Sequence, residues 1–405
     1  MGFQQGLSGL NAAARNLDVI GNNVANTNTV GFKSSRAEFA DAYAASLNGG
    51  GGSNPGIGVS VADLAQQFTQ GDVTTTGNSL DIAISGGGFY RMTDSGSITY
   101  TRNGQFKLDR NGYIINAQGM QLTGYPADAS GAINAGVPQP LQLETADVPP
   151  RASATASVAV GLSANATVPT VPFDIADGAS YAGGTSLPLY DTLGREHALG
   201  LYFRKVADNA WEVHGSVDGT ALGAPLGTLS FNTDGSLNAG ASTIPMNVAV
   251  PVGADAGGTL PIELSMAGVT QFGTEFSVSA LEQDGYASGR LAGFSVGSDG
   301  TILSRYTNGV TMARGRVALA NFANPQGLQS LGDNQWAETA DSGAPLVGSP
   351  GSGTLGILQS GAIESSNVDL TAELVNMIMA QRVYQANAQT IKTNDQLLQT
   401  IVNLR

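Results

Sequence analysis

The sequence predicts a mainly β protein with terminal α-helices: two nested all-β domains plus an N- and C-terminal helical coiled-coil domain. Three observations predict this class. Apolar residues recur at helical spacing at both chain ends, and glycine-containing turn signals recur between them. One β motif occurs twice, on either side of a stretch that is rich in alanine, threonine and valine. With 55 glycines in 405 residues, tight turns and short strands should dominate the middle of the chain.

The first 25 residues form the first predicted helix. Their apolar residues follow one another at spacings of three and four, apart from a gap at Gly21, and this spacing places them on one helical stripe. The stripe consists of Phe3, Leu7, Leu10, Ala14, Leu17 and Val24. We expect it to pack against another helix.

The C-terminal end follows the stricter a/d pattern of a coiled coil. This second stripe consists of Leu370, Leu374, Met377, Gln381, Tyr384, Ala388, Ile391, Asp395, Leu398 and Val402. Ser366 and Asp369 have the spacing of a capping box, which predicts where the helix starts. Gln381 and Asp395 are polar at stripe positions, where they either fix the register of a buried seam or lie at its rim.

Both helices have one narrow apolar face, so they fit one another or copies in neighbouring molecules. An ordinary two-helix pair that closes a globular domain is the alternative. The predicted helical core domain comprises residues 1–25 and 365–405. Residues 26–75 are expected to form a linker segment with a flexible, solvent-facing loop at the glycine run Gly49–Gly52.

Turn signals of the Asp-Gly and Asn-Gly type separate short alternating segments in the middle of the chain. The pattern Phe-x-aliphatic-x-x-(Asn/Asp)-Gly-x-Ile occurs at residues 106–114 and again at 294–302. The simplest account is one β domain, residues 76–145 and 283–364, that is interrupted by a second all-β domain of residues 146–282.

Charge and composition exclude several classes of partner. A net charge of −14 and a pI near 4.4 would repel nucleic acid and an anionic membrane surface. No stretch approaches the roughly 18 to 20 apolar residues of a spanning helix. The chain has no cysteine, so disulfides and thiolate metal sites are ruled out. We expect no nucleic-acid binding, no membrane insertion, no metal and no cofactor.

No catalytic residues are expected either. Gly293–Gly297 reads Gly-Phe-Ser-Val-Gly, but a turn and another strand should follow the serine, and both histidines precede it. Gly351–Gly356 matches a dinucleotide fingerprint, but Pro350 precedes it and no helix should open at its third glycine. His197 and His214 are interpreted as solvated strand residues and not as metal ligands.

Residues 21–33 read Gly-Asn-Asn-Val-Ala-Asn-Thr-Asn-Thr-Val-Gly-Phe-Lys. This segment resembles the signature shared by flagellar rod, hook and hook-associated proteins. The signature positions are Asn22, Asn23, Ala25, Asn26, Thr29, Gly31 and Phe32. Residues 3–13 are similar to the start of hook proteins, and Glu364–Leu370 resembles the family's junction into the C-terminal helix. The likeness covers nearly the whole chain and is weakest in the inserted domain.

The resemblance implies a structural subunit of the flagellar hook, polymerising into a curved, bendable tube that transmits torque from the motor to the filament. A distal rod subunit of the basal body is the alternative, although the size of the inserted domain favours the hook. An unrelated secreted β-rich adhesin or enzyme is a third interpretation. In the family's architecture the terminal helices form the inner layer of the tube. The assembly residues would be Phe3, Leu7, Leu10, Leu17, Val24, Leu370, Leu374, Met377, Tyr384, Ile391, Leu398 and Val402.

The resemblance also implies the partners and the location. The main partner would be the chain itself, in a helical homopolymer. Further partners would be the distal rod protein, the hook cap protein, the hook-filament junction protein, the hook-length control protein and the flagellar type III export apparatus. Export through that apparatus, without a cleaved signal peptide, would place the chain outside the cell, in the flagellar hook and basal body.

Overall fold

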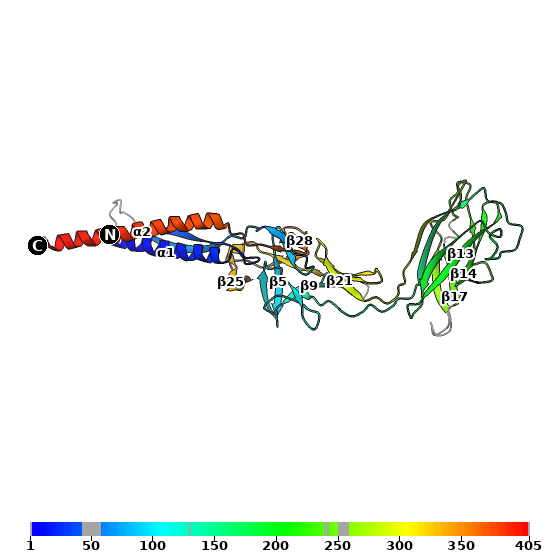
Figure 1. Ribbon diagram of the computed structural model, residues 1–405, viewed down its shortest axis with the longest axis horizontal. Coiled ribbons are helices and arrows are strands. Elements are labelled where there is room, and N and C mark those ends of the chain that lie inside the picture. Colours follow the sequence, from blue (N-terminus) through cyan, green and yellow to red (C-terminus); the bar gives the residue numbers. More distant parts are fainter. Residues whose placement is uncertain are drawn as a thin grey trace. The chain divides into compact units, whose positions relative to one another are not determined.

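The computed structural model describes residues 2–42, 58–128, 131–238, 240, 243–249 and 259–403. The chain forms two compact units (Figure 1). Unit 1 comprises Met1–Thr145, Gly293–Ser304 and Met312–Arg405, and unit 2 comprises Ala146–Ala292 and Arg305–Thr311. The expected loop at Gly49–Gly52 lies outside the described residues. Neither described helix combines the length and the apolar character of a membrane span.

Two long helices stand at the ends of the chain and lie side by side in unit 1 (Figure 1). They are α1 (Gly2–Ala25) and α2 (Leu370–Asn403). Asp369 caps α2, because its Oδ1 accepts the backbone N–H groups of Thr371 at 2.9 Å and Ala372 at 3.1 Å. The expected capping box is therefore corrected: Ser366 is not the cap and only accepts the N–H of Val368.

A hairpin of β1 (Ser35–Ala42) and β2 (Gly58–Gln66) packs against α1. It lies in residues 26–75, the segment expected to be a linker. A two-stranded hairpin is marginal by itself. Here the burial of Ala37 and Ala65 supports it. The sequence analysis missed this element although Val59, Ser60 and Val61 alternate, because the alternation is short and the residues that the hairpin buries are small alanines.

The β part of unit 1 combines strands from both sides of the insertion. The path through its large sheet is β21-β22-β23-β9-β5-β6-β26-β25. The strands of this sheet are β5 (Phe89–Asp94), β6 (Ser97–Thr101), β7 (Lys107–Leu108), β8 (Ile114–Ile115), β9 (Gln121–Pro126), β10 (Gln139–Pro140), β21 (Leu291–Val296), β22 (Thr301–Tyr306), β23 (Thr311–Val317), β24 (Leu319–Asn321), β25 (Gln329–Gly332), β26 (Gln335–Ala337) and β27 (Leu346–Gly348). Two small pairs accompany it, β3 (Val73–Thr75) with β29 (Ala362–Glu364) and β4 (Ile82–Ser85) with β28 (Ile357–Ser360).

The repeated sequence pattern forms two equivalent hairpins, β7–β8 and β21–β22. Each turn contains a glycine with positive φ, Gly112 at 84° and Gly300 at 81°, a conformation that favours glycine. The pattern's last residues, Ile114 and Ile302, are fully buried in the same apolar core. Segments from before and after the insertion thus complete one β structure.

Unit 2 consists of two sheets with an apolar core. One sheet contains β11 (Thr155–Ser163), β17 (Thr243–Ala249), β18 (Thr259–Ser265), β19 (Thr270–Phe272) and β20 (Ser277–Gln283). The other contains β12 (Gly183–Tyr190), β13 (Glu196–Ala207), β14 (Ala210–Val217), β15 (Thr220–Ala221) and β16 (Gly227–Ser230). Residues of both sheets share this core, as in a sandwich. The fold class predicted from the sequence is confirmed.

Both histidines were expected to be solvated, and this expectation is wrong. His197 is buried, and its Nδ1 lies 2.8 Å from Asp218 Oδ2. His214 is also buried, because its ring stacks on Phe173 with centroids 4.0 Å apart. Its Nε2 lies 3.2 Å from Glu212 Oε2 on the same strand face.

Candidate assembly surface and polar junction

Small residues form the seam between the two helices. A Cβ added at Gly6 would lie 3.0 Å from Ile391 Cγ1, and one at Gly9 would lie 2.7 Å from Asn387 Oδ1. Near the other end of α1, Asn23 Nδ2 donates to Glu373 Oε1 at 3.0 Å. The helices are therefore antiparallel, and their backbones approach closely where α1 has glycine.

Most of the large apolar residues in the two predicted stripes lie outside this seam. On α1, Phe3 is 48% exposed and Leu7 is 44% exposed, while Leu10, Leu17 and Val24 are half-buried. The seam side of α1 instead buries Ala12, Ala13 and Ile20.

The C-terminal stripe is split in the same way. Met377 and Ile391 are half-buried, and Ile391 contacts α1 near Gly6. The exposed members are Leu370, Leu374, Gln381, Tyr384, Asp395 and Leu398. Val402 lies in α2, but its side chain is outside the described residues.

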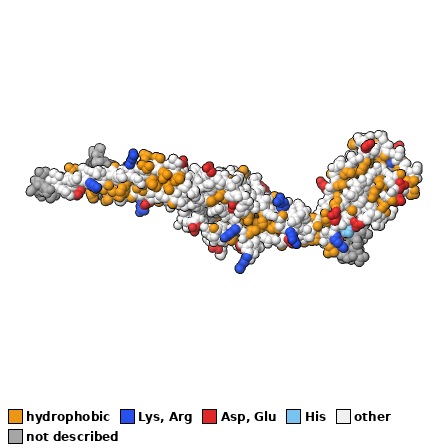
Figure 2. Space-filling model, in the orientation of Figure 1, with side chains coloured by type: hydrophobic (Ala, Val, Ile, Leu, Met, Phe, Trp, Pro, Cys, Tyr) orange, Lys and Arg blue, Asp and Glu red, His pale blue; other side chains and the backbone are white. Residues whose placement is uncertain are grey.

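Within the part of the chain that the structure describes, an apolar surface consequently remains uncovered on the helix pair. Beyond the predicted stripe, α2 also exposes Val375, Ile378, Met379, Val383 and Leu397. Figure 2 shows hydrophobic side chains gathered along the helices. We call the exposed apolar residues of α1 and α2 together the assembly surface. Exposed apolar surface of this extent on one element is typical of a site that binds another protein.

A groove adjoins the assembly surface. It has a volume of about 880 Å³ and is lined by residues of α1, α2 and the β1–β2 hairpin. Phe39 and Val59 line it from the hairpin, and Met379 and Val383 line it from α2. The polar side chains of Asn16 and Asn23 also line it.

The signature segment forms the turn that ends α1. The carbonyl of Asn22 accepts hydrogen bonds from the backbone N–H and the side-chain Nδ2 of Asn26. Thr29 Oγ1 then donates to Asn26 Oδ1 at 3.0 Å. Gly31 has a φ of 70°, and an added Cβ there would lie 2.7 Å from the backbone nitrogen of Asn103. These contacts explain why asparagine, threonine and glycine stand in this segment.

The other signature residues connect this turn to its neighbours. Asn23 bonds both backbone groups of Ser35: its Oδ1 accepts the N–H at 2.9 Å and its Nδ2 donates to the carbonyl at 2.8 Å. The N–H of Phe32 donates to the Thr29 carbonyl. Ala25 is the last residue of α1 and is exposed.

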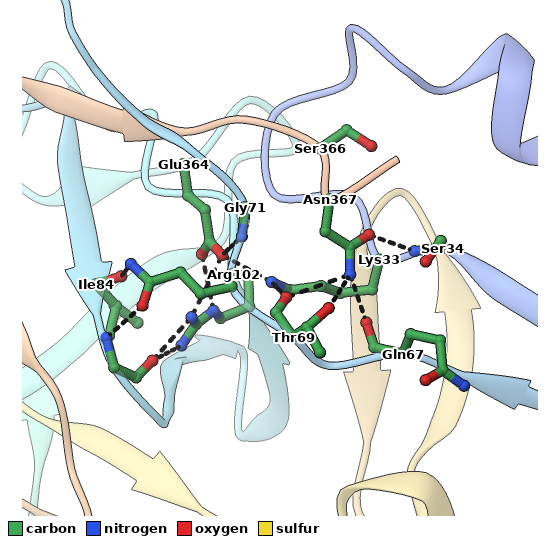
Figure 3. A network of polar contacts seen from close by, with 12 residues as sticks. Lys33, Ser34, Gln67, Thr69, Gly71, Ile84, Arg102, Glu364, Ser366 and Asn367 are labelled. Carbon is green, nitrogen blue, oxygen red and sulfur yellow. Dashed lines mark hydrogen bonds and ion pairs between the residues drawn. The ribbon is translucent and has the colours of Figure 1, made fainter. Parts of the chain in front are cut away.

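A buried group of three charged residues lies next to the signature (Figure 3). Glu364 Oε1 accepts a hydrogen bond from Lys33 Nζ at 2.7 Å, and its Oε2 accepts one from Arg102 Nε at 2.9 Å. The side chains of all three are at least 96% buried. Gly71 N–H also donates to Glu364 Oε1, at 3.0 Å. We call Lys33, Arg102 and Glu364 the charge cluster.

The charge cluster contains two cations and one anion. Burial lowers the pKa of Lys33, an effect that the Glu364 carboxylate opposes and Arg102 reinforces. Lys33 Nζ also donates to the Thr69 carbonyl at 2.7 Å. Arg102 completes its hydrogen bonding with the carbonyls of Gly86 and Gly88. Its guanidinium therefore connects the end of β6 to Glu364 at the end of β29 through a fixed planar fork.

Comparisons with known proteins fit this arrangement of helices and β domains. The flagellar hook protein FlgE of Salmonella typhimurium is 47% identical over 414 residues, which cover 100% of both chains. The flagellar hook protein FlgE of Escherichia coli is 45% identical over 412 residues, again covering both chains completely. The flagellar hook protein FlgE of Borreliella burgdorferi is 34% identical and covers 99% of this chain and 98% of its own. The chain belongs to the flagellar hook protein family.

Models of flagellar protein families match successive parts of this hook family chain. Residues 3–33 match the flagella basal body rod protein model, and residues 83–164 match the flagellar hook protein FlgE/F/G D1 domain. Residues 161–286 match the flagellar basal body protein FlaE D2 domain, and residues 359–404 match the flagellar basal body rod FlgEFG protein C-terminal model. The full-length relatives are hook proteins, so the chain is a hook subunit and the distal rod alternative is not retained.

A solved structure shares the fold of the hook family chain. The crystal structure of Helicobacter pylori flagellar hook protein FlgE2 has a TM-score of 0.55 and 13% sequence identity. It covers 72% of this chain and 99% of its own. At this identity the match supports the fold alone.

The sequence analysis of this hook subunit missed the charge cluster. Lys33 and Glu364 appeared only as the ends of two resembling segments, and Arg102 was not singled out. A signal was nevertheless present, because only 18 lysines and arginines occur in the chain and one of them, Lys33, ends the signature segment. Their meeting point depends on tertiary structure that a linear pattern does not contain.

Proposed function

We propose that this hook subunit polymerises through its terminal helices into a curved, bendable tube, and that the tube transmits torque from the motor to the filament. The role is structural and requires no catalysis and no cofactor. Residues 1–25 and 365–405 form the inner layer around a central channel. Residues 26–75 connect it to the first β domain, 76–145 with 283–364, and residues 146–282 form the second β domain.

The uncovered assembly surface on the helix pair carries this proposal. A helix with exposed apolar residues on several sides gains stability when a further helix covers them. α2 exposes apolar side chains from Leu370 to Leu398, well beyond the part that contacts α1. Neighbouring copies of the same chain supply the missing cover in a coiled-coil layer.

The two ends of the helix pair favour an open polymer over a closed dimer. The helices are antiparallel and Gly6 lies beside Ile391, so α1, which begins at Gly2, is too short to cover all of α2 from Ile391 to Asn403, and the end of α2 projects past α1. Leu397 and Leu398 in this end are each 56% exposed. The groove, by contrast, lies beside α1 and the first half of α2. Contacts between unlike surfaces of identical subunits generate helical filaments when they do not close a ring.

The proposal extends to location and partners. The chain is exported through the flagellar type III apparatus without a cleaved signal peptide and works outside the cell, in the flagellar hook. It meets the distal rod protein at one end of the tube and the hook-filament junction protein at the other. The hook cap protein and the hook-length control protein act during its assembly.

Electron microscopy of polymers tests the function. The full chain and a variant without residues 1–25 and 367–405 are purified and placed under polymerising conditions. We expect curved tubes from the full chain and none from the truncated chain, since the truncation removes the assembly surface. Circular dichroism of the truncated chain serves as the control for the folding of its β domains.

Two outcomes would contradict the proposal. Tubes from the truncated chain would show that the helices are not the assembly site. A full chain that never polymerises, or that turns over a substrate, would return the adhesin or enzyme interpretation. A substitution inside the assembly surface refines the test: Leu374→Asn is expected to reduce polymer yield, whereas Thr371→Asn, also exposed on α2, is not.

A further inference from the structure

Three irregular segments lie between the helix pair, the β1–β2 hairpin and the β part of unit 1 in the described residues. They are residues 26–34 after α1, residues 67–72 after β2, and residues 365–369 before α2. Residues 67–72 lead from β2 into β3 and residues 365–369 lead from β29 into α2, so these two segments carry the chain between the helical part and the β part of unit 1. Their stiffness and direction therefore decide how the helices are held.

Polar contacts connect the three segments directly to one another (Figure 3). Asn367 accepts the N–H of Ser34 at 2.8 Å through Oδ1. Its Nδ2 donates to the carbonyl of Gln67 at 2.7 Å and to Thr69 Oγ1 at 2.9 Å. The N–H of Gln67 in turn donates to the Ser34 carbonyl at 2.8 Å. One asparagine side chain thus links all three segments.

The charge cluster connects the same segments to the β part. Glu364 immediately precedes the segment that leads into α2, and Lys33 lies in the segment that follows α1. Arg102 follows β6. The two oxygens of one carboxylate hold both cations and the N–H of Gly71. The carboxylate is therefore bonded to four separate parts of the chain, including its own.

Stability alone is a poor explanation for this cluster. Desolvation of buried charges offsets most of their attraction, and apolar residues of similar volume often stabilise a protein as well or better. Charged hydrogen bonds differ from apolar contacts in that they are directional, and the Arg102 fork admits few geometries. A cluster of this kind specifies one arrangement of the segments more than it stabilises them.

We propose that Glu364, Lys33 and Asn367 are positioning residues that fix the direction in which the helix pair leaves the first β domain, and that this direction sets the curvature of the polymer. The proposal rests on the polymerising function proposed above. Every subunit contains the same junction, so a substitution that changes its preferred direction acts at every position along the tube. The readout is therefore the shape of the polymer and not its presence.

A charge-matched double variant separates positioning from stability. Glu364→Gln alone leaves two buried cations without an anion and is expected to destabilise unit 1. Lys33→Met combined with Glu364→Gln leaves Arg102 as the single cation, so the net charge of the cluster stays at one positive charge. We expect this double variant to fold and polymerise, but into tubes whose radius of curvature and pitch are shifted from those of the unchanged chain.

A second pair of substitutions provides the control. Arg151→Met with Asp284→Asn removes an ion pair of 3.1 Å whose arginine is 59% exposed, far along the chain from the junction. We expect this variant to give tubes of unchanged curvature. If the charge-matched double variant also gives tubes of unchanged curvature, the positioning role is wrong.

Asn367→Ala decides the case in which the double variant does not fold. This substitution removes the contacts that the Asn367 side chain makes with Ser34, Gln67 and Thr69 and introduces no buried charge, so unit 1 should still fold. Altered curvature supports the proposal, and unchanged curvature overturns it. Absence of polymer from the unchanged chain would instead contradict the proposed function, so the two failures are distinguishable.

Discussion

Lys33 shows how one buried side chain makes stability depend on pH. Its ammonium group is almost completely buried against the Glu364 carboxylate and the Thr69 carbonyl. Burial lowers its pKa from the usual value of 10.5. The unfolded chain therefore binds more protons than the folded chain between the lowered pKa and 10.5, and the free energy of unfolding rises with pH in that window.

We expect unit 1 to become more stable as the pH is raised from neutral toward 10.5, and Lys33→Met to remove this part of the gain. Chemical denaturation of both proteins at several pH values measures it. Tyr90 limits the useful range, because burial raises its pKa well above 10.0 and stability falls once unfolded tyrosines ionise. An equal slope of stability against pH in both proteins would contradict the role of Lys33.

The sequence predicted the signature residues but not their physical roles. Asn23, Asn26, Thr29 and Gly31 lie within one turn, so a local pattern was sufficient to single them out. Lys33 and Glu364 are 331 positions apart, and Arg102 and Glu364 are 262 apart. Nothing in the spacing of these residues indicates that one carboxylate holds both cations. The assignment of the assembly residues remains a prediction until polymers are examined.

The terminal helices show why helical periodicity predicted the elements better than their partners. The apolar stripes correctly indicated a helix at each end. They did not indicate the seam, which uses Gly6, Gly9 and Ala13 because small residues permit close approach of the two backbones. A periodic apolar stripe identifies a helix face that is stabilised by burial, but the residues that bury it can belong to another molecule.

Two glycines of α1 offer a matched test of the seam. Gly9→Val should separate the helices, since its Cβ would lie 2.7 Å from Asn387, and overpacking of this kind costs about 1–3 kcal/mol. Gly21→Ala meets nothing within 4 Å and should stabilise the helix by about 0.5–1 kcal/mol. Thermal depolymerisation measures both.

We expect the depolymerisation temperature to fall for Gly9→Val and to stay equal or rise for Gly21→Ala. The seam would be wrong if both substitutions had the same effect.

The nested chain order of the subunit has a physical consequence for its two units. The chain leaves the first β structure, forms unit 2 and returns, so the two connecting strands run side by side. Val148 and Gly289 exchange backbone hydrogen bonds at 2.9 and 3.2 Å, and Arg151 and Tyr286 exchange bonds at 3.0 and 2.9 Å. The repeated pattern predicted from sequence that the chain returns to the first β structure, because its two copies can share one core only if the chain re-enters that structure after unit 2.

This pairing permits removal of most of unit 2 without separating the ends. Arg151 and Tyr286 form the hydrogen-bonded pair that a two-residue hairpin loop closes, so Asn-Gly can replace residues 152–285. We expect the shortened chain to fold, since the core of unit 1 keeps all its residues, and to polymerise through its helices. We expect unit 2 to contact neighbouring subunits in the tube, so the tubes of the shortened chain should differ in curvature from those of the full chain.

Electron microscopy of the tubes and swimming of cells that carry the shortened chain measure the two effects. Loss of all polymer, with unit 1 still folded, would show that unit 2 and not the helix pair drives assembly. Unchanged curvature and unchanged swimming would show that unit 2 has no mechanical role. If the shortened chain still polymerises but its tubes have a different curvature, the two roles are distinct: the helix pair drives assembly and unit 2 affects the curvature.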